Sequence, residues 1–211
     1  MLELAHICVA RDGRSLFKPC SLSVERGQVG TIMGPSGLGK TSLLHALVKP
    51  EPGLVLEGVV RLDGIERPAE GPLLGCAHTV FQEPMLFPHL SVGANMALPI
   101  HAQPISAQRA AVTDMLARLE LPDLADADPM SLSRGQQMRV SLGRALIGRP
   151  RVLLLDEPFS ALDHATRDRI KAWLYTEIAQ QGVMGVLVTH QVEDRPVHGE
   201  MTCLMPRSSH D

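Results

Sequence analysis

The segment GPSGLGKT, residues 34–41, restricts the possible fold more strongly than any other part of the sequence. It matches the pattern G-x-x-x-x-G-K-[S/T], in which a glycine-rich loop leads from a strand into a helix and cradles phosphate with its backbone N–H groups. An apolar run at 29–33 precedes the loop, and an apolar helical stripe over 43–48 follows it and stops at Pro50. We therefore predict a strand, a phosphate-binding loop and a helix, in this order, around a nucleoside triphosphate site.

Two side chains of this segment have expected chemical roles. The ammonium of Lys40 would reach the β- and γ-phosphates, and the hydroxyl of Thr41 would bind magnesium. The alternative interpretation, a glycine-rich turn with an incidental lysine, does not explain why a strand and a helix flank the loop. The predicted phosphate-binding residues are Gly34, Pro35, Ser36, Gly37, Leu38, Gly39, Lys40, Thr41 and Ser42.

A pair of adjacent carboxylates follows the most apolar strand candidate, residues 152–155. Neighbouring like charges disfavour each other's ionisation, so a nearby cation or a chemical role is expected. Successive side chains of an extended segment point to opposite faces, which predicts separate tasks for the two acids. We expect Asp156 to bind magnesium and Glu157 to act as general base toward the attacking water. Without the phosphate loop, a solvated strand end would be the simpler interpretation.

The composition is that of one ordinary globular domain of 211 residues, with 45% hydrophobic and 20% charged residues. The net charge of -3 gives no electrostatic reason to expect a nucleic-acid partner. No apolar run reaches the roughly 18 residues of a membrane-spanning helix, and the N-terminus does not have the pattern of a secretory signal. The four cysteines are scattered without a CxxC pair, so we expect reduced thiols in a cytosolic protein.

The order of apolar runs and helical patterns, together with the phosphate loop, predicts an α/β fold with a P-loop NTPase core. Strand candidates at 29–33, 79–81, 152–155 and 185–189 alternate with helical patterns, which favours a mostly parallel sheet. The opening segment predicts antiparallel strands at one edge of this sheet. We expect a single domain over 1–211, divided into a nucleotide-binding core (1–82 and 148–211) and an inserted helical subdomain (83–147).

A capping-box pattern, Ser133 followed by Gln136, begins the second helix expected in the insertion, which starts at Arg134. The first N–H groups of a helix have no partner within the helix and form an anion-binding end. Two interpretations remain open for these residues taken alone. Ser133 caps only its own helix, or the helix start also binds phosphate.

Six motifs in order carry a family resemblance over nearly the whole chain, which resembles the ATP-binding subunits of ABC transporters. The motifs are 34–41 (Walker A), Gln82 in FQEPMLFPHLSV (Q-loop), LSRGQ from Leu132 (signature, usually LSGGQ), 152–157 (Walker B), 160–163 (D-loop) and His190 (switch histidine).

This resemblance implies a RecA-like core. It also implies a head-to-tail dimer in which each ATP lies between the Walker A loop of one subunit and the signature of the other. It implies Ser133, Gly135 and Gln136 as further nucleotide contacts, and ATP and Mg²⁺ as cofactors. The implied catalytic residues are Glu157, His190, Lys40 and Gln82, and the implied metal ligands are Thr41, Gln82 and Asp156.

The resemblance further implies an ATPase that powers solute transport. The implied partners are a second ABC ATPase subunit in a homodimer, a multi-span membrane permease and a solute-binding protein. The segment EPMLFPHLSVGANMAL resembles importers, and the expected location is peripheral, at the cytoplasmic face of the inner (plasma) membrane. The alternative is a soluble ABC-type ATPase that is not coupled to transport. A GTPase would normally carry an N-K-x-D motif, which this sequence lacks, and a P-loop kinase would need neither signature nor switch histidine.

The sequence departs from the family pattern in two places. Arg134 occupies the place of the first glycine of LSGGQ, and Arg11 and Asp12 stand where an aromatic residue usually stacks on adenine. Arg11 is the first candidate for a replacement because its guanidinium can stack on a base, and Phe17 is the second. The chain ends shortly after His190, so no C-terminal regulatory domain is expected.

Overall fold

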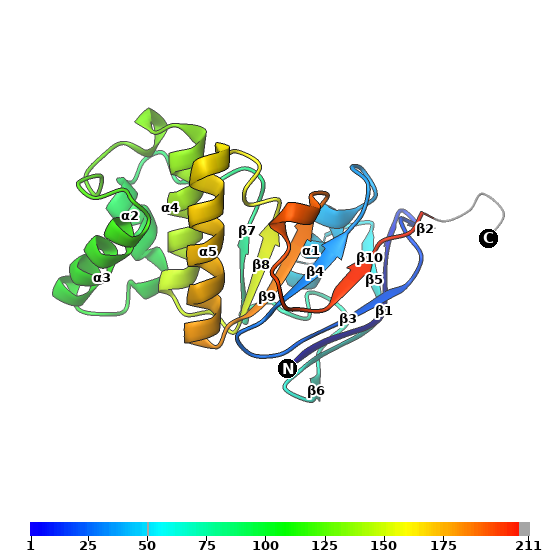
Figure 1. Ribbon diagram of the computed structural model, residues 1–211. Coiled ribbons are helices and arrows are strands. Elements are labelled where there is room, and N and C mark those ends of the chain that lie inside the picture. Colours follow the sequence, from blue (N-terminus) through cyan, green and yellow to red (C-terminus); the bar gives the residue numbers. More distant parts are fainter. Residues whose placement is uncertain (50, 207–211) are drawn as a thin grey trace. The chain divides into compact units, whose positions relative to one another are not determined.

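The computed structural model describes residues 1–49 and 51–206, which form two compact units (Figure 1). The first unit contains Met1–Thr79, Arg151–Glu157 and the chain from Ile178 onward. The second contains Val80–Pro150 and Pro158–Glu177. Among the described residues, no helix is both long enough and apolar enough to cross a membrane.

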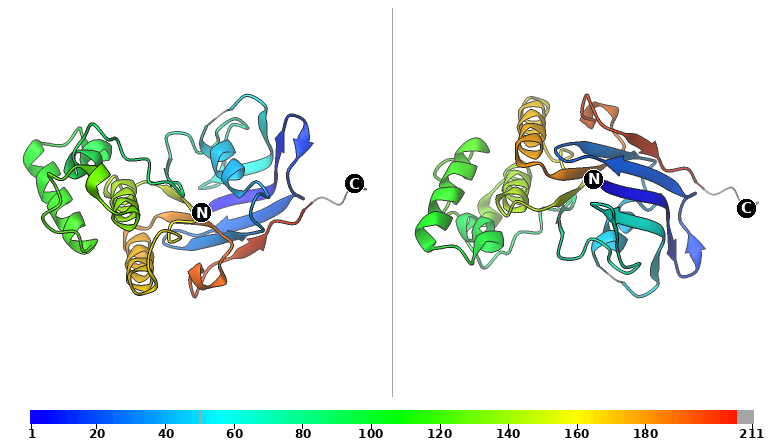
Figure 2. Two further views of the ribbon diagram at one scale, coloured as in Figure 1. Left: turned by 90° about the horizontal axis from the view of Figure 1, so that it is seen from above. Right: turned by 90° about the horizontal axis from the view of Figure 1, so that it is seen from below.

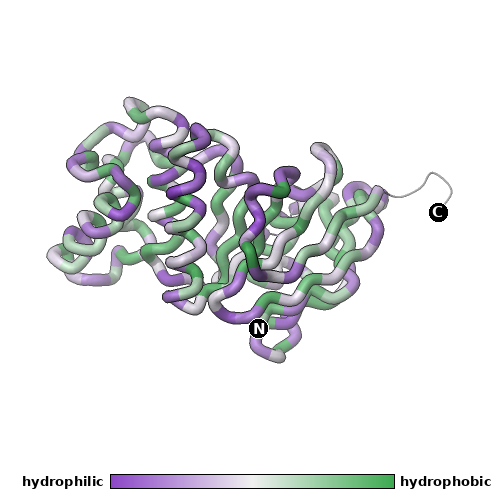
Figure 3. Tube along the Cα trace, viewed as in Figure 1, coloured by the Kyte–Doolittle hydropathy of each residue, from purple (hydrophilic) through white to green (hydrophobic). Residues whose placement is uncertain are grey.

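The first unit contains a five-stranded sheet in the order β10-β4-β9-β8-β7. β4 pairs in parallel with β9 and β10, and β8 pairs in parallel with β9. Every residue of β8 and β9 is buried, which explains their uninterrupted apolar sequences. In Figure 3 most of these two strands has the colour of hydrophobic residues. The strands are β4 (Val29–Met33), β7 (Ala77–Val80), β8 (Val152–Asp156), β9 (Met184–Thr189) and β10 (Met201–Cys203).

All four expected strands of this sheet are present, but their bounds differ by a few residues. β7 begins and ends before the predicted 79–81, and the short outer strand β10 was not expected. β10 has three residues, two of them exposed, and so lacks the buried apolar run that identifies the other strands.

The predicted antiparallel strands at the N-terminus form a sheet of their own. β5 was not expected from the sequence, yet it pairs with β1 along most of its length. In β5, exposed residues alternate with buried ones over much of the strand. Such a strand lacks the continuous apolar run by which a fully buried strand is recognised in the sequence. The five strands are β1 (Leu2–Arg11), β2 (Arg14–Ser15), β3 (Cys20–Val24), β5 (Leu54–Leu62) and β6 (Ile65–Glu66).

Helix α1 (Lys40–Val48) joins the two sheets of the first unit. It contacts β1 and β5 of the antiparallel sheet and β8 of the parallel sheet. Its side chains Leu43, Leu44 and Leu47 are fully buried in a core that includes residues of both sheets. The helix ends two residues before Pro50, which lies outside the described residues. The apolar stripe predicted from the sequence is thus what fixes the helix, and with it the phosphate loop, to the sheets.

The second unit is mostly helical and includes residues 158–177, which the sequence analysis placed in the nucleotide-binding core. Figure 2 shows α2, α3 and α4 gathered together from two further sides. The helices pack closely around Gly143, where a Cβ atom would lie 2.6 Å from Leu119 Cδ1 and 2.7 Å from Met96 Cε. The helices are α2 (Val92–Ala97), α3 (Ile105–Arg118), α4 (Arg134–Ile147) and most of α5 (His164–Gln181), with short 3-10 turns η1 (Leu98–Ile100) and η2 (Pro129–Ser131).

Candidate functional site

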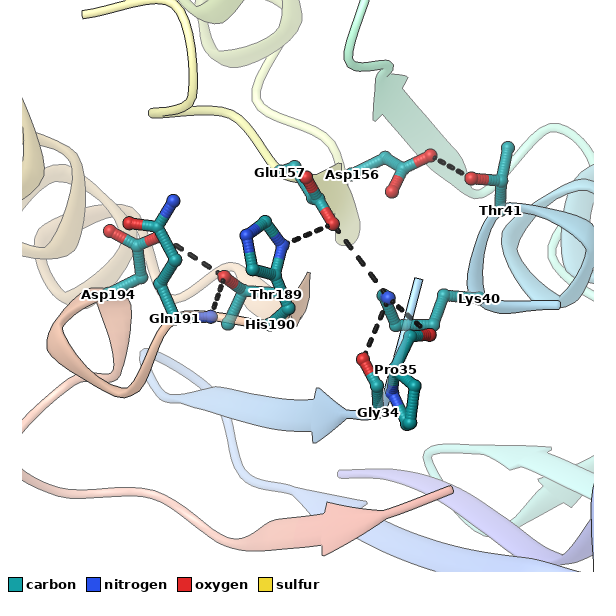
Figure 4. Close-up of polar contacts among 10 residues, drawn as sticks. All are labelled: Gly34, Pro35, Lys40, Thr41, Asp156, Glu157, Thr189, His190, Gln191 and Asp194. Atoms are coloured by element: carbon teal, nitrogen blue, oxygen red, sulfur yellow. Dashed lines mark hydrogen bonds and ion pairs between the residues drawn. The ribbon is translucent and has the colours of Figure 1, made fainter. Parts of the chain in front are cut away.

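Three segments of the first unit that lie far apart in the sequence meet at one edge of the parallel sheet (Figure 4). The phosphate loop follows β4, Asp156 ends β8, and His190 follows β9. These strands run parallel, so their carboxyl ends share the edge at which open α/β sheets bind ligands. Contacts among the side chains of Lys40, Thr41, Asp156, Glu157 and His190 connect the three segments.

The phosphate loop has the backbone conformation that glycine makes accessible. Gly37 and Gly39 have φ values of 79° and 93°, in the left-handed region. At Gly39 a Cβ atom would also lie 2.7 Å from Leu16 Cδ1. Gly39 is the N-cap of α1, and no side chain caps the helix there. The N–H groups of the first turn are therefore left for an anion, and this arrangement fits a phosphate group.

Lys40 brings a buried positive charge to this loop. Its side chain is 6% exposed, and its Nζ donates to the carbonyl oxygens of Gly34 at 2.9 Å and Pro35 at 3.0 Å. Glu157 Oε1 lies 3.8 Å from the same nitrogen. These three oxygens compensate the ammonium for the water that it loses on burial. The cation is thereby held at the loop, where it can meet a phosphate.

Asp156 and Thr41 form a pair of oxygen ligands. Thr41 Oγ1 donates to Asp156 Oδ2 at 2.6 Å, and Asp156 is 3% exposed. Burial raises the pKa of Asp156; the hydrogen bond from Thr41 partly offsets this, and the adjacent charge of Glu157 adds to it. A hydroxyl and a carboxylate are hard oxygen ligands of the kind that Mg²⁺ prefers, so the pair fits a magnesium ion.

The backbone of Glu157 is not extended, although the sequence analysis assumed that it is. Its φ of 46° lies in the left-handed region, so it does not continue the extended strand, and side-chain alternation does not apply to it. The two carboxylates still have separate partners, because Glu157 Oε1 lies 2.8 Å from His190 Nδ1 and turns toward Lys40, whereas Asp156 binds Thr41. A left-handed glutamate costs free energy, and such strain is concentrated at functional sites.

Around His190 the structure shows three residues to which the sequence analysis gave no role. Thr189, Gln191 and Asp194 form a hydrogen-bonded group on both sides of the histidine (Figure 4). Asp194 is the last residue of the short 3-10 turn η3 (Val192–Asp194) and is 2% exposed. A strand-terminal threonine and an acid five residues later are individually common, so only the spatial arrangement identifies them.

The signature segment lies in the second unit and begins α4 with the predicted capping box. Ser133 Oγ accepts from the Gln136 N–H at 3.3 Å, and Gln136 Oε1 accepts from the Ser133 N–H at 2.9 Å. Gly135 packs closely enough that a Cβ atom would lie 3.3 Å from Ala161 O. A cavity of about 300 Å³ is lined by this helix start and by residues 161–163 of the D-loop segment.

Gln82 and Arg134 are exposed residues of the second unit. Gln82 lies in the loop that follows β7. The Arg134 guanidinium lies 3.0 Å from Glu83 Oε1, next to Gln82 in the chain. The residue that replaces the first signature glycine is therefore paired with the Q-loop segment of its own unit.

Of the two candidates for adenine stacking, Phe17 is wrong. Its ring is fully buried in the core and offers no face to a base. Arg11 is exposed at the end of β1, where the Asp12–Gly13 turn, with left-handed φ at both residues, leads into β2. Arg11 therefore stays a prediction.

Comparison with known proteins gives one consistent result. A family model described as ABC transporter matches residues 17–160. The spermidine/putrescine import ATP-binding protein PotA of Chromobacterium violaceum is 37% identical over 195 residues, which cover 90% of this chain and 53% of PotA. The putrescine transport ATP-binding protein PotG of Escherichia coli is 33% identical over 209 residues, 98% of this chain and 55% of PotG. The chain thus spans about half the length of the curated relatives it matches.

Solved structures resemble the chain over almost its full length. The dimeric structure of MJ0796, a bacterial ABC transporter cassette, has a TM-score of 0.81 and 29% identity, and the match covers 97% of this chain and 94% of that one. The cbiO1 protein of Clostridium perfringens, part of the ABC transporter complex cbiONQ, has a TM-score of 0.79 and 26% identity, with 97% and 84% covered. The chain therefore belongs to the ABC transporter family, as an importer-like nucleotide-binding domain.

Proposed function

We propose that the chain hydrolyses ATP as one half of a head-to-tail dimer and thereby powers solute import through separate membrane subunits. One observation carries the enzymatic part: a buried lysine, a buried aspartate, a strained glutamate and a histidine meet beside an uncapped helix start. The transport part is supported by relatives that are named as import ATP-binding proteins and by a structural neighbour that is part of a transporter complex.

The proposed binding roles follow from the contacts of each side chain. The loop N–H groups and Lys40 bind the phosphates, and Lys40 then exchanges its contacts with Gly34 and Pro35 for phosphate oxygens. Thr41 and Asp156 would hold Mg²⁺, which when bound would supply Lewis-acid polarisation of the phosphates. The role of Gln82 as a further metal ligand stays a prediction.

Glu157 is the proposed general base. It accepts a proton from a water molecule whose oxygen forms a bond to the γ-phosphorus, while the bond from that phosphorus to the ADP oxygen breaks. His190 Nδ1, 2.8 Å from Glu157 Oε1, orients the carboxylate, and we assign its other ring nitrogen to the γ-phosphate. Lys40 offsets the negative charge of Glu157 from the opposite side, at 3.8 Å.

The dimer completes each site with a second copy of the chain. In this proposal Ser133, Gly135 and Gln136 present the start of α4 to a nucleotide bound by the other subunit. The nucleotide-binding core (1–82 and 148–211) then carries the Walker motifs, and the helical subdomain (83–147) carries the signature. A multi-span permease and a solute-binding protein complete the transporter, with this chain peripheral at the cytoplasmic face of the inner membrane and without a nucleic-acid partner.

Substitution of Glu157 tests the enzymatic proposal. Glu157→Gln removes the base but keeps a side chain of the same shape, so ATP turnover falls by about 100-fold or more while nucleotide binding persists. Lys40→Ala instead weakens the binding of a fluorescent ATP analogue. Glu25→Gln, at an exposed turn of the same unit, is the matched control and leaves both properties unchanged. Normal turnover by Glu157→Gln would refute the proposed base.

Coupling to transport is tested by affinity purification of the tagged chain from detergent-solubilised membranes of the native organism. We expect a multi-span membrane protein to co-purify in stoichiometric amount. Recovery of the chain entirely from the soluble fraction, with full ATPase activity and no membrane partner, would favour the soluble ATPase instead.

A further inference from the structure

We propose that Asp194 is a positioning residue for His190, which it holds in place by fixing the backbone on both sides of the histidine. This inference rests on the proposed function, because it gives Asp194 a role in the geometry of the His190–Glu157 pair. Asp194 lies outside the phosphate loop, and it bonds to Thr189 and Gln191, the two neighbours of the histidine in the chain.

The hydroxyl of Thr189 connects the two sides. Thr189 Oγ1 donates to Asp194 Oδ2 at 3.1 Å and accepts from the Gln191 N–H at 3.0 Å (Figure 4). A hydroxyl has one proton to donate, so the amide must use a lone pair of Oγ1 and the proton must go to the carboxylate. Asp194 N–H also donates to Gln191 O at 3.3 Å. The residues before and after His190 are therefore joined directly by the Thr189 hydroxyl, and both also bond to the buried Asp194.

This group extends the rigidity of the sheet to the histidine. Thr189 is the last residue of β9 and lies opposite Met33, the residue of β4 that precedes the phosphate loop. Beyond Thr189 the strand ends, and His190 itself is 44% exposed. An exposed ring at a strand end is not held by packing, so its position depends on the backbone beside it. The contact of Asp194 with Thr189 supplies that constraint.

The burial of Asp194 supports a specific role rather than an incidental contact. Its side chain is 2% exposed and Thr189 is 1% exposed. A carboxylate is costly to bury and is retained only where hydrogen bonds satisfy it. An apolar residue would fill the same space without that cost, but it would leave the Thr189 hydroxyl proton without this acceptor.

Three variants of the full chain test the proposal. Asp194→Ala removes the acceptor, Asp194→Asn keeps an oxygen acceptor in nearly the same place, and Thr189→Val removes the hydroxyl while preserving shape. We expect Asp194→Ala and Thr189→Val each to lower kcat about tenfold with unchanged ATP affinity, because small displacements of reacting groups are costly. The double variant should lose no more than either single one, and Asp194→Asn should retain most of the activity. Glu193→Gln, on the neighbouring exposed residue, is the control and keeps wild-type kcat.

A second readout does not require turnover. In protein with isotope-labelled histidine, the Nδ1 resonance of His190 reports its hydrogen bond to Glu157. We expect this resonance to shift or broaden in Asp194→Ala and Thr189→Val, and to stay in place in Asp194→Asn. The resonance can be measured even if the wild-type chain proves unable to hydrolyse ATP. The experiment therefore distinguishes failure of the proposed function from failure of this inference. The proposal would be overturned if Thr189→Val left both the His190 resonance and kcat unchanged. It would also be overturned if adding Asp194→Ala to His190→Ala lowered kcat by a further tenfold.

Discussion

At the scale of the residue, the two adjacent carboxylates of the site differ in their surroundings. Asp156 is buried and bonded to a hydroxyl, whereas Glu157 faces an ammonium and an imidazole. Burial opposes the ionised form of Asp156, and this is reflected in its raised pKa. In the absence of a bound cation, an ionised Asp156 therefore reduces the stability of the folded chain.

This cost gives a prediction for Asp156→Asn in nucleotide-free protein with a chelator present. The folded chain holds the Asp156 proton more tightly than the unfolded chain, so wild-type stability falls as pH rises from 3.8, the ordinary value, through the folded pKa. An asparagine side chain does not ionise, so the stability of the variant lacks this pH dependence. Its Oδ1 can still accept the hydrogen bond from Thr41. Urea unfolding should show the variant more stable than wild type at pH 7, with the difference shrinking toward pH 4. A difference that is the same at both pH values would contradict the assigned cause.

At the scale of the element, a buried asparagine shapes the loop that connects β7 to α2. Asn95 is fully buried in the first turns of α2. Its Oδ1 accepts from the Phe87 N–H at 2.8 Å, and its Nδ2 donates to the carbonyl oxygens of Phe87, Leu90 and Ser91 at 3.0–3.1 Å. One side chain thereby satisfies several backbone groups of a loop that has no strand or helix to pair them.

We therefore predict that Asn95→Ala destabilises the chain by about 2 kcal/mol or more, because unpaired buried polar groups cost about 1–3 kcal/mol each. The measurement is urea unfolding followed by far-UV circular dichroism. Ser91→Ala is the comparison: it removes one side-chain bond, to the exposed Ala94 N–H at 3.2 Å, and should cost about 1 kcal/mol. If Asn95→Ala were no more harmful than Ser91→Ala, the loop would not depend on this side chain.

At the scale of the whole molecule, the candidate ligands of one nucleotide are divided between the two compact units. The phosphate loop, Asp156, Glu157 and His190 belong to the first unit, and the signature segment that begins at Ser133 belongs to the second. Under the head-to-tail proposal, these halves come from different subunits.

Mixing two inactive variants tests this division. Lys40→Ala damages the phosphate loop and Ser133→Arg damages the helix start, so a heterodimer of the two retains one intact composite site. We expect the mixture to regain ATPase activity that neither variant has alone. The control mixes Lys40→Ala with the Lys40→Ala/Ser133→Arg double variant, which can form no intact site and should stay inactive. If the test mixture were as inactive as this control, the two motifs would not act across a dimer.

Sequence by itself determined the parts of this protein that depend on neighbouring residues. The phosphate loop follows from its glycines and its lysine, the capping box of α4 from a serine and a glutamine three residues apart, and the buried strands from uninterrupted apolar runs. Each of these is a short-range property, because backbone conformation, helix capping and burial pattern are set within a few residues. The family followed from the order of such motifs.

Only the tertiary structure decided which distant groups meet. Glu157 contacts His190 because strands β8 and β9 lie side by side. The bond from Thr189 to Asp194 and the burial of Phe17 likewise depend on how distant segments pack together in the core. The left-handed Glu157 and the separate antiparallel sheet are likewise outcomes of packing, which overrides the local preference for an extended acid after a strand. Short-range sequence patterns thus identified the chemical groups of the site, and long-range packing set the distances between those groups.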